Sequence, residues 1–496
     1  MPTMTDAATL PEPTLRISVV GTGYLGATHA ACMAELGFEV LGLDIDPAKV
    51  QALSAGELPF HEPGLPELLL KHVDSGRLRF TTSYEEVGAW ADVHFIGVGT
   101  PQKPGETAAD LRFVDAAVTS LARHITRDAL IVGKSTVPVG TATRLKDLLA
   151  TTRTQAQAAG PLAGEVELAW NPEFLREGYA VQDTLSPDRL VVGVESDHAE
   201  GLLRQVYAKS LAEDTPWIRT DFATAELVKV AANAFLATKI SFINAFSEIT
   251  EQVGGDIGTL ADAIGHDPRI GRKFLNAGVG FGGGCLPKDI RALQARVSEL
   301  GLDRTTRFLA EMDDINLRRR DRVVDLAVQV LSHSLHGPSS AASPRTAGAD
   351  GAGSVPSPAA VEILHGAKVA MLGVTFKPNS DDVRDSPALD VANRLYTAGA
   401  DVAVYDPQGN ANAAQRFPRL GYVDSLEKAL VGADLVILLT EWDEFKTMDP
   451  DYVGRLVDRR NLIDGRNVLD PRPWQDAGFT TAALGHRFAP PPLEGS

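Results

Sequence analysis

The chain has 496 residues, of which 44% are hydrophobic and 23% are charged. This length predicts about three domains, each large enough to form its own core. Acidic residues outnumber Lys and Arg by 65 to 47, so the formal net charge is −18 at pH 7. Because affinity for nucleic acid depends on basic surface, this balance argues against a nucleic-acid partner. Any anionic ligand must meet positive charge that is gathered locally.

The chain contains two cysteines, Cys32 and Cys285. Two thiols exclude a disulfide framework or a cysteine-built zinc site, and they fit a reducing cytoplasm. The first residues are polar and lack the basic and apolar segments of a signal peptide. No apolar run approaches the roughly 18 residues of a membrane span. We therefore expect a cytoplasmic protein with no membrane partner. The histidines show no metal-ligand spacing, so we expect no metal.

Short apolar runs alternate with helical patterns in the first part of the chain. Strands are expected at residues 16–22, 39–45, 78–82, 92–99, 129–135, 166–171 and 189–195. Strands that are apolar on both faces and alternate with helices predict βαβ units and a doubly wound parallel sheet.

The middle of the chain has a different pattern. Residues 222–253 contain no Gly or Pro, which predicts one long helix ending at Gly254. Further helical pattern extends to about 335. A stretch rich in Gly, Ala, Ser and Pro follows, and it indicates a flexible linker. The βα pattern then resumes up to a tail, 489–496, that is expected to be disordered.

The predicted fold class is α/β, with two Rossmann-like doubly wound domains joined by a long-helix central domain. The expected domains are an N-terminal Rossmann domain at 14–221, a central helical domain at 222–335, a linker at 336–359 and a smaller C-terminal Rossmann-like domain at 360–488.

A glycine-rich turn, Gly21-Thr22-Gly23-Tyr24-Leu25-Gly26, follows the first expected strand and opens a helix expected over 24–37. Such glycines let a pyrophosphate approach backbone N–H groups at a helix N-terminus. Asp44 follows at about the 20-residue distance expected for an acid that binds ribose hydroxyls, which favours NAD over NADP. The alternative is a tight turn with a surface Asp. Cys32, inside this helix, is interpreted as a small buried hydrophobe.

A second glycine-rich stretch, 280–289, reads Gly-Phe-Gly-Gly-Gly-Cys-Leu-Pro-Lys-Asp. Pro287 suits the first turn of a helix, which places Cys285 just before a helix N-terminus and next to Lys288. Both features favour a thiolate. The glycines would leave room for a bulky substrate around the sulfur. We predict that Cys285 is a nucleophile, and the alternative is a connector with an incidental cysteine.

Three polar residues of the long helix, Glu226, Lys229 and Asn233, share one face. Their neighbours Leu227, Val230 and Ala231 are expected to face the core. The polar face is interpreted either as a binding site for an anionic or oxyanionic group or as a solvated stripe, and the pattern leaves both open.

Polar residues also follow several of the expected strands, where α/β sheets place their ligands. Glu173 and Glu177 follow one strand, and either is a candidate base or water-positioning group. Alternatively, both are acids at the start of a helix. The Gly99-Thr100 and Ser135-Thr136 turns offer hydroxyls to a cofactor. A second nucleotide site is possible after Phe376-Lys377, although no glycine fingerprint is present there.

These stretches together resemble the UDP-glucose/GDP-mannose dehydrogenase family over almost the whole chain. The matching motifs are GTGYLG (21–26), LDID (43–46), HEPGLPELL (61–69), STVPVGT (135–141), NPEFLREG (171–178), GHDPRIGRKFLNAGVGFGGGCLPKD (265–289), FKPNSDDVRDSP (376–387) and LIDGRNVLD (462–470). The stretch RIGRKFLN favours UDP-glucose as the substrate over GDP-mannose or UDP-N-acetylmannosamine. The 337–358 insert is not part of the family core.

The resemblance implies an NAD-dependent, four-electron oxidation of UDP-glucose to UDP-glucuronate. The C6 alcohol becomes an aldehyde, Cys285 captures it as a thiohemiacetal, a second hydride transfer gives a thioester, and water hydrolyses the thioester. One UDP-glucose, two NAD and one water would give UDP-glucuronate and two NADH. The catalytic residues implied are Cys285, Lys229, Asn233, Asp289, Glu173 and Thr136.

The resemblance also implies two sets of binding residues. The cofactor would be held by Gly21, Gly23, Tyr24, Leu25, Gly26, Asp44, Lys49, Val98, Thr100, Ser135, Thr136, Glu177, Lys288 and Arg384. The sugar nucleotide would be held by Glu173, Phe174, Leu175, Lys229, Asn233, Arg269, Phe274, Asn276, Gly280, Gly282, Phe376, Lys377 and Arg466. In the family the counterpart of Arg269 reaches the neighbouring subunit, which implies a homodimer or a higher homo-oligomer. The alternatives are a dehydrogenase of another nucleotide sugar and a non-enzymatic nucleotide sensor.

Overall fold

The computed structural model describes residues 15–160, 162–336 and 358–488. The chain divides into two compact parts, one ending at Ala232 and one beginning at Asn233. The predicted tail, and all of the predicted linker except its two ends, lie outside the described residues; His336 ends one helix and Pro358 begins another. The predicted domain boundaries stay predictions.

The first part contains an eight-stranded sheet of order β3-β2-β1-β4-β5-β6-β7-β8. The strands are β1 (Arg16–Val20), β2 (Glu39–Leu43), β3 (Leu78–Thr81), β4 (Val93–Ile96), β5 (Ala129–Gly133), β6 (Val166–Trp170), β7 (Leu190–Gly193) and β8 (Trp217–Thr220). Neighbouring strands are parallel except β6 and β7, which pair antiparallel at Trp170 and Gly193. A wholly parallel sheet was therefore the wrong expectation at this one pair. β8 was missed because no residue of it is buried and it carries no apolar run.

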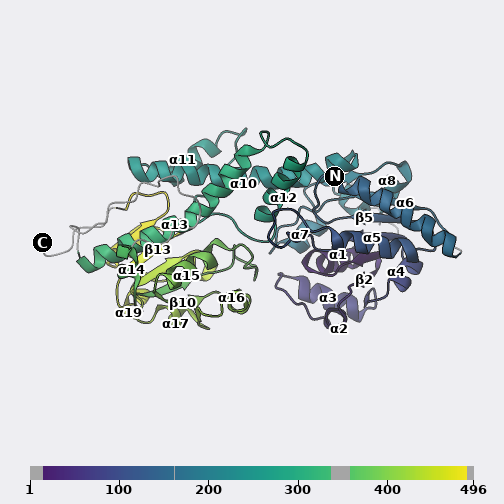
Figure 1. Ribbon diagram of the computed structural model, residues 1–496. Coiled ribbons are helices and arrows are strands. Elements are labelled where there is room, and N and C mark those ends of the chain that lie inside the picture. The colour runs from purple at the N-terminus through teal and green to yellow at the C-terminus, as the bar shows by residue number, and fades with distance from the viewer. Residues whose placement is uncertain (1–14, 161, 337–357, 489–496) are drawn as a thin grey trace, which may run out of the picture. The chain divides into compact units, whose positions relative to one another are not determined.

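Helices cover both faces of this sheet (Figure 1). They are α1 (Tyr24–Glu35), α2 (Pro47–Ser54), α3 (Leu65–Asp74), α4 (Tyr84–Trp90), α5 (Arg112–His124), α6 (Thr141–Ala159), α7 (Ala180–Leu185), α8 (Asp197–Val206) and α9 (Ala208–Ala212). One apolar core joins the sheet to α1, α3 and α8, and another joins it to α4, α5 and α6. Burial of both faces explains why most of the strands are apolar throughout.

The second part contains a six-stranded parallel sheet of order β11-β10-β9-β12-β13-β14. Its strands are β9 (Lys368–Leu372), β10 (Asp401–Tyr405), β11 (Gly421–Tyr422), β12 (Leu435–Leu438), β13 (Asn461–Asp464) and β14 (Thr480–Ala483). Both sheets thus reverse their strand order after the first strand of the domain, which is where doubly wound folds place a ligand. The prediction of two Rossmann-like domains is confirmed.

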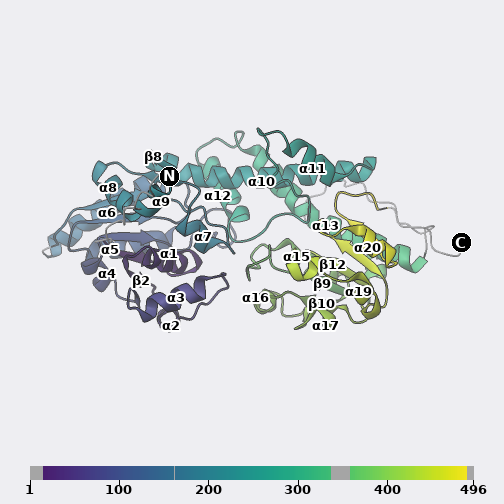
Figure 2. The same ribbon diagram turned by 180° about the vertical axis from the view of Figure 1, so that it is seen from behind.

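Long helices precede the second sheet in the chain (Figure 2). The helices from here on are α10 (Phe222–Val253), α11 (Ile257–Gly265), α12 (Leu286–Glu299), α13 (Arg307–His336), α14 (Pro358–Leu364), α15 (Pro387–Thr397), α16 (Asn410–Arg416), α17 (Leu426–Leu430), α18 (Asp443–Lys446), α19 (Pro450–Leu456) and α20 (Pro471–Asp476). α10 has the predicted bounds, and α13 packs against α14 and α15. Within residues 15–160, 162–336 and 358–488, no helix combines the length and apolar character needed to cross a membrane.

The orientation of α10 differs from the expectation. Its three polar residues, Glu226, Lys229 and Asn233, are buried, whereas Leu227 is 42% exposed and Ala231 is exposed as well. Only Val230 faces inward as predicted. The reason is visible at Glu226, whose carboxylate accepts hydrogen bonds from the backbone N–H groups of Gly140 (2.7 Å) and Ala142 (2.6 Å) at the start of α6. Two backbone donors satisfy the buried carboxylate. The polar face of α10 therefore points into the protein and is not a solvated stripe.

Candidate active site

The turn after β1 favours glycine at its first position. Gly21 has φ +87°, and a Cβ there would lie 2.6 Å from the side chain of Val98 and 2.9 Å from its backbone. At Gly26 a Cβ would lie 1.8 Å from the carbonyl oxygen of Gly21. Gly23 precedes the first residue of α1, and nothing lies within 4 Å of the position a Cβ would take. The N-terminus of α1 is therefore open to a phosphate group at this glycine.

Asp44 lies directly after β2 and faces the same turn. Its Oδ2 accepts hydrogen bonds from the Thr22 N–H (2.9 Å), the Thr22 hydroxyl (3.1 Å) and the Lys49 ammonium (2.9 Å). Burial raises the pKa of Asp44, but Lys49 and the backbone N–H groups outweigh burial and hold the pKa below its usual value. Asp44 is thus ionised, with an acceptor oxygen, Oδ1, that takes a longer bond of 3.2 Å from the Asp46 N–H.

The predicted hydroxyl residues meet at the carboxyl ends of β4 and β5. The Thr100 hydroxyl donates to the Thr136 carbonyl (2.8 Å), and the Ser135 hydroxyl donates to the Val98 carbonyl (2.6 Å). These bonds join the turns after the two strands, and Val98 also contacts Gly21. The structure therefore brings the predicted cofactor residues of the first part to one edge of the sheet. Lys288 and Arg384 lie in the second part, so their contact with the cofactor stays a prediction.

Glu62 is a residue of this edge that sequence reasoning missed. Its buried carboxylate accepts hydrogen bonds from the N–H groups of Gly178 (2.6 Å) and Ala180 (2.7 Å) and from the hydroxyl of Tyr24. Burial and this carboxylate raise the pKa of Tyr24. Glu62 thus connects the glycine turn to the NPEFLREG stretch. It also occupies the N-terminus of α7, where Glu173 and Glu177 were the alternative expectation. Its only sequence signal is its place in the HEPGLPELL motif.

Glu173 and Lys229 form a buried ion pair. The Lys229 Nζ lies 3.0 Å from Glu173 Oε1, and Glu173 Oε2 accepts a hydrogen bond of 2.5 Å from the Leu175 N–H. The Lys229 ammonium also lies 5.6 Å from the ring centre of Phe174. These pairwise contacts link four of the predicted catalytic or substrate residues, three in the turn after β6 and one on α10.

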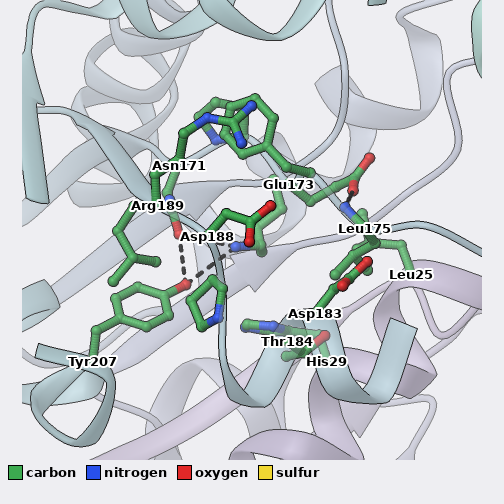
Figure 3. A pocket seen from close by; sticks show the side chains of 15 residues that line it. Leu25, His29, Asn171, Glu173, Leu175, Asp183, Thr184, Asp188, Arg189 and Tyr207 are labelled. Carbon is green, nitrogen blue, oxygen red and sulfur yellow. Dashed lines mark hydrogen bonds between the residues drawn. The ribbon is translucent and has the colours of Figure 1, made fainter. Parts of the chain in front are cut away.

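A pocket lies beside Glu173 in the first part of the chain (Figure 3). Its wall is formed by Leu25 and His29 of α1, the 171–175 turn, Lys134, Tyr207, the residues 183–184 and the residues 187–190. Asn171 and Tyr207, joined by a hydrogen bond in Figure 3, lie on the wall together with Glu173.

Cys285 lies at the N-cap of α12, with Pro287 in the first turn, as predicted, and it is exposed. One turn into the helix, buried Asp289 accepts a hydrogen bond from the Asn233 side-chain amide (2.7 Å) and pairs with the Lys288 ammonium (2.9 Å). The structure thus brings Asn233 and Asp289 together. In contrast, Cys32 is buried, and burial raises the pKa of its thiol to about 12, which confirms the interpretation of this cysteine as a packing residue.

The glycines before Cys285 have a packing role in addition to the one expected. A Cβ on Gly282 would lie 2.5 Å from the Asp385 carbonyl, one on Gly283 would lie 2.9 Å from the Phe376 ring, and one on Gly284 would lie 2.3 Å from the Arg384 guanidinium. The Gly283 N–H also donates to the Arg384 carbonyl at 2.8 Å. These glycines let the loop pack directly on the 376–385 loop.

Arg466 organises the same region through backbone carbonyls. Its guanidinium donates to the carbonyls of Gly280 (3.2 Å) and Phe376 (3.0 Å). The loops of this region also contain non-glycine residues with positive φ, which is a strained conformation found preferentially at functional sites. These residues are Phe274 (66°), Asn379 (60°), Asp385 (47°) and Asn467 (57°).

Arg269 and Asn276 bond to close chain neighbours in the described structure. The Arg269 side chain is 87% exposed and pairs with Asp267, and the Asn276 side-chain oxygen accepts a bond of 2.7 Å from Arg272. Arg384 pairs with Asp382 at 2.7 Å. Among the described residues, no group of three or more His, Cys, Asp or Glu side chains is arranged to hold a metal ion.

One Rossmann-like sheet carries a turn of the dinucleotide-binding type. In the other domain, a cysteine at a helix N-terminus follows a loop that packs on the loops of the sheet. These two features are typical of NAD-dependent dehydrogenases with two Rossmann-like domains. Three family models match the chain: the NAD binding domain at residues 15–211, the central domain at 223–318 and the UDP binding domain at 370–471, all of the UDP-glucose/GDP-mannose dehydrogenase family. The chain belongs to this family.

Several known proteins are similar to the chain over nearly its whole length. A UDP-glucose 6-dehydrogenase of Rhizobium meliloti is 37% identical over 95% of this chain and 99% of its own. One from Bacillus subtilis is also 37% identical, over 95% and 93%. The structure of a UDP-glucose dehydrogenase from Pyrobaculum islandicum aligns with a TM-score of 0.77 at 36% identity, covering 93% of this chain and 96% of that one. The predictions of the family, the fold class and NAD as the cofactor are confirmed, and the roles of the individual site residues stay predictions.

Proposed function

We propose that the chain is an NAD-dependent UDP-glucose 6-dehydrogenase that converts UDP-glucose, two NAD and water into UDP-glucuronate and two NADH. The observation that carries this proposal is the exposed Cys285 at the N-terminus of α12, one turn from the buried Asp289–Asn233 pair. A simple alcohol dehydrogenase has no need of a nucleophile. A second oxidation does need one, because only an adduct of the aldehyde carries a hydride on a carbon that also bears an oxyanion.

The residues of the first part fit the cofactor. The open N-terminus of α1 at Gly23 would receive the pyrophosphate, and ionised Asp44 would accept hydrogen bonds from ribose hydroxyls while repelling a 2′-phosphate. Bound NAD supplies the hydride acceptor for each of the two oxidations.

In this proposal each of the predicted catalytic side chains has a separate role. Glu173, held by Lys229 and the Leu175 N–H, assists proton transfer and later thioester hydrolysis. The Cys285 sulfur forms a bond to the aldehyde carbon, and the positive end of α12 stabilises the thiolate beforehand. Lys229 and Asn233 stabilise the oxyanion, and loss of a hydride from the adduct leaves the thioester. Asp289 and Thr136 order the water that releases the carboxylate product.

The decisive experiment offers UDP-glucose, UDP-N-acetylmannosamine and GDP-mannose in turn to the purified chain with NAD and counts the NADH formed. We expect UDP-glucose to be the preferred substrate, with two NADH for each sugar consumed. NADH from another sugar but not from UDP-glucose would favour the alternative substrate. No NADH from any sugar, with intact nucleotide binding, would favour a nucleotide sensor.

We further propose that the enzyme is a homodimer or higher homo-oligomer formed along α10. Phe235, Phe242 and Ile249 are 66%, 45% and 53% exposed and recur every seven residues, so they share one face of the helix. Exposed Arg269 is then available to a neighbouring subunit. Light scattering should report a dimer or larger for the native chain and a monomer for Phe242→Glu. A native monomer would contradict this proposal. The low cysteine content, with two cysteines in 496 residues, supports the expected cytoplasmic location.

A further inference from the structure

Lys134, which follows β5, carries a buried positive charge that the proposed reaction does not use. The side chain is 7% exposed. Its ammonium donates to the Asn171 side-chain oxygen (2.9 Å) and the Tyr207 hydroxyl (3.1 Å), and it lies 5.7 Å from the ring centres of both Phe95 and Tyr207. Within the described residues it forms no ion pair with a carboxylate. Burying an ammonium group that has only neutral hydrogen-bond partners costs folding free energy. This cost suggests that Lys134 has a function in addition to packing.

Asn171 connects Lys134 to the turn that carries Glu173. The Asn171 side-chain oxygen also accepts a bond of 2.6 Å from the Tyr207 hydroxyl, and both of these side chains are labelled in Figure 3. With the two bonds from Lys134, the three side chains form a closed set. The Asn171 side-chain amide donates to the Val191 carbonyl (2.8 Å), and its backbone N–H donates to the Gly133 carbonyl (2.8 Å). The side chain and the backbone N–H of Asn171 are thus held by hydrogen bonds, and Glu173 follows two residues later.

The charge on Lys134 also interacts with the Glu173–Lys229 pair. Burial lowers the pKa of Lys134 to about 8; the Glu173 carboxylate raises it and the Lys229 ammonium lowers it further. His29 of α1 faces the same space, and burial together with Lys134 holds its pKa well below 6.5, so it is neutral. Burial raises the pKa of Tyr207, which is neutral as well. Asp183, Asp188 and Arg189 complete the charged groups of the pocket wall.

We infer that Lys134 is a positioning residue for the Glu173–Lys229 pair: it holds Asn171 at the start of the turn that carries Glu173, and it places a second buried positive charge beside that pair. The inference rests on the proposed function, in which Glu173 transfers protons. It has a consequence that simple packing does not have. Removing a nearby positive charge raises the pKa of a carboxylate, so the pH dependence of the reaction must change when Lys134 is neutralised.

The test compares Lys134→Met, which keeps the length of the side chain without its charge, with Tyr207→Phe, which removes one hydroxyl and leaves the charge. The kcat and KM for UDP-glucose are measured from pH 5 to 9. For Lys134→Met we expect kcat to fall about tenfold with KM nearly unchanged, and the acid limb of the kcat profile to shift up by about one pH unit. For Tyr207→Phe we expect a smaller fall in kcat and an unshifted limb.

An unshifted acid limb in Lys134→Met would overturn the proposed electrostatic role. If Lys134→Met does not fold, Tyr207→Phe still decides the matter, because an unchanged kcat in that variant would contradict positioning by the closed set of side chains.

A measurement without substrate separates this inference from the proposed function. Because the pKa of folded Lys134 is about 8 against 10.5 for the unfolded chain, the unfolded chain binds more protons between these values. Stability therefore rises with pH across that window in the native chain and not in Lys134→Met. The Tm advantage of Lys134→Met over the native chain should shrink from pH 8 to 10. A constant difference would overturn the inference, whereas a native chain that makes no NADH from UDP-glucose would overturn only the proposed function.

Discussion

The two Rossmann-like domains begin alike and then diverge at one carboxylate. Gly21 and Gly373 both follow the first strand of their sheet with φ +87°, and each donates its N–H to the last residue of the second strand, Leu43 (2.7 Å) or Tyr405 (2.8 Å). An aspartate follows the second strand in both domains, Asp44 in one and Asp406 in the other. The backbone framework of a dinucleotide turn is therefore present twice.

The two aspartates differ in the number of hydrogen bonds that their carboxylate oxygens accept from the protein. Both oxygens of Asp406 accept hydrogen bonds from several donors. These are the N–H groups of Val374, Thr375, Gln408 and Gly409, the Thr375 hydroxyl and the Trp442 indole, at 2.8 to 3.2 Å. Asp44 has one oxygen with a single long bond. The same topology thus carries an aspartate that keeps hydrogen-bonding capacity in one domain and an aspartate whose oxygens are both used inside the protein in the other, so function must be argued from the individual site.

The largest expected effect is on turnover in a Cys285 variant, which should lose the reaction while keeping its affinity for NAD. Cys285→Ala should lower turnover by at least about a thousandfold, because the aldehyde can no longer form the adduct that loses the second hydride. NAD affinity, measured by fluorescence titration, should not change. Cys32→Ala is the matched control and should keep its activity. Full activity in Cys285→Ala would exclude the cysteine from the reaction.

Asp406→Ala should act on stability alone. It leaves several buried donors without an acceptor, so we expect a loss of about 3 kcal/mol or more in the free energy of unfolding. Denaturant unfolding measures this loss, and the KM for NAD should stay at the native value. A raised KM with unchanged stability would mean that Asp406 binds a ligand rather than bracing the domain.

Asp44→Asn should act mainly on the cofactor. Loss of charged hydrogen bonds to the ribose should raise the KM for NAD by about tenfold, and the preference for NAD over NADP should narrow. Steady-state kinetics with both cofactors is the measurement. If Asp44→Asn were as destabilising as Asp406→Ala and left NAD binding unaffected, the proposed difference in role between the two aspartates would be contradicted.

The smallest expected effects come from the matched pair Gly21→Ala and Gly373→Ala. The left-handed backbone alone costs about 1–2 kcal/mol in each, and the new Cβ meets Val98 or Thr440 in addition. Thermal unfolding should show similar losses for both, whereas only Gly21→Ala should weaken NAD binding. Equal losses of NAD affinity in the two variants would show that the turns are not functionally distinct.

Much of the fold is predictable because its pattern is local. Apolar runs locate most of the strands, and the absence of Gly and Pro defines α10 to the residue. β8 is not predictable in this way, since its residues are not buried and leave no apolar run. The inward face of α10 is not predictable either. Glu226 is buried because it accepts hydrogen bonds from backbone donors at the start of α6, which is far away in the sequence, so the pattern of α10 itself gives no sign of them.

The same distinction between local patterns and long-range contacts applies to the site residues. Cys285, the glycine turn and Asp44 are found because their chemistry needs a fixed local spacing. Glu62 and Lys134 are not found, because each acts through partners that are far away in sequence and near in space. Roles that depend on a closed set of side chains become visible only when the set is assembled.

The loop of glycines before Cys285 has a mechanical consequence. Because Gly282, Gly283 and Gly284 touch Asp385, Phe376 and Arg384 without intervening side chains, the two loops have no slack between them. A displacement of one loop is therefore expected to move the other. The loop that carries Phe376 and Arg384 thus contributes to the position of the Cys285 thiol, although it is distant from Cys285 in the sequence.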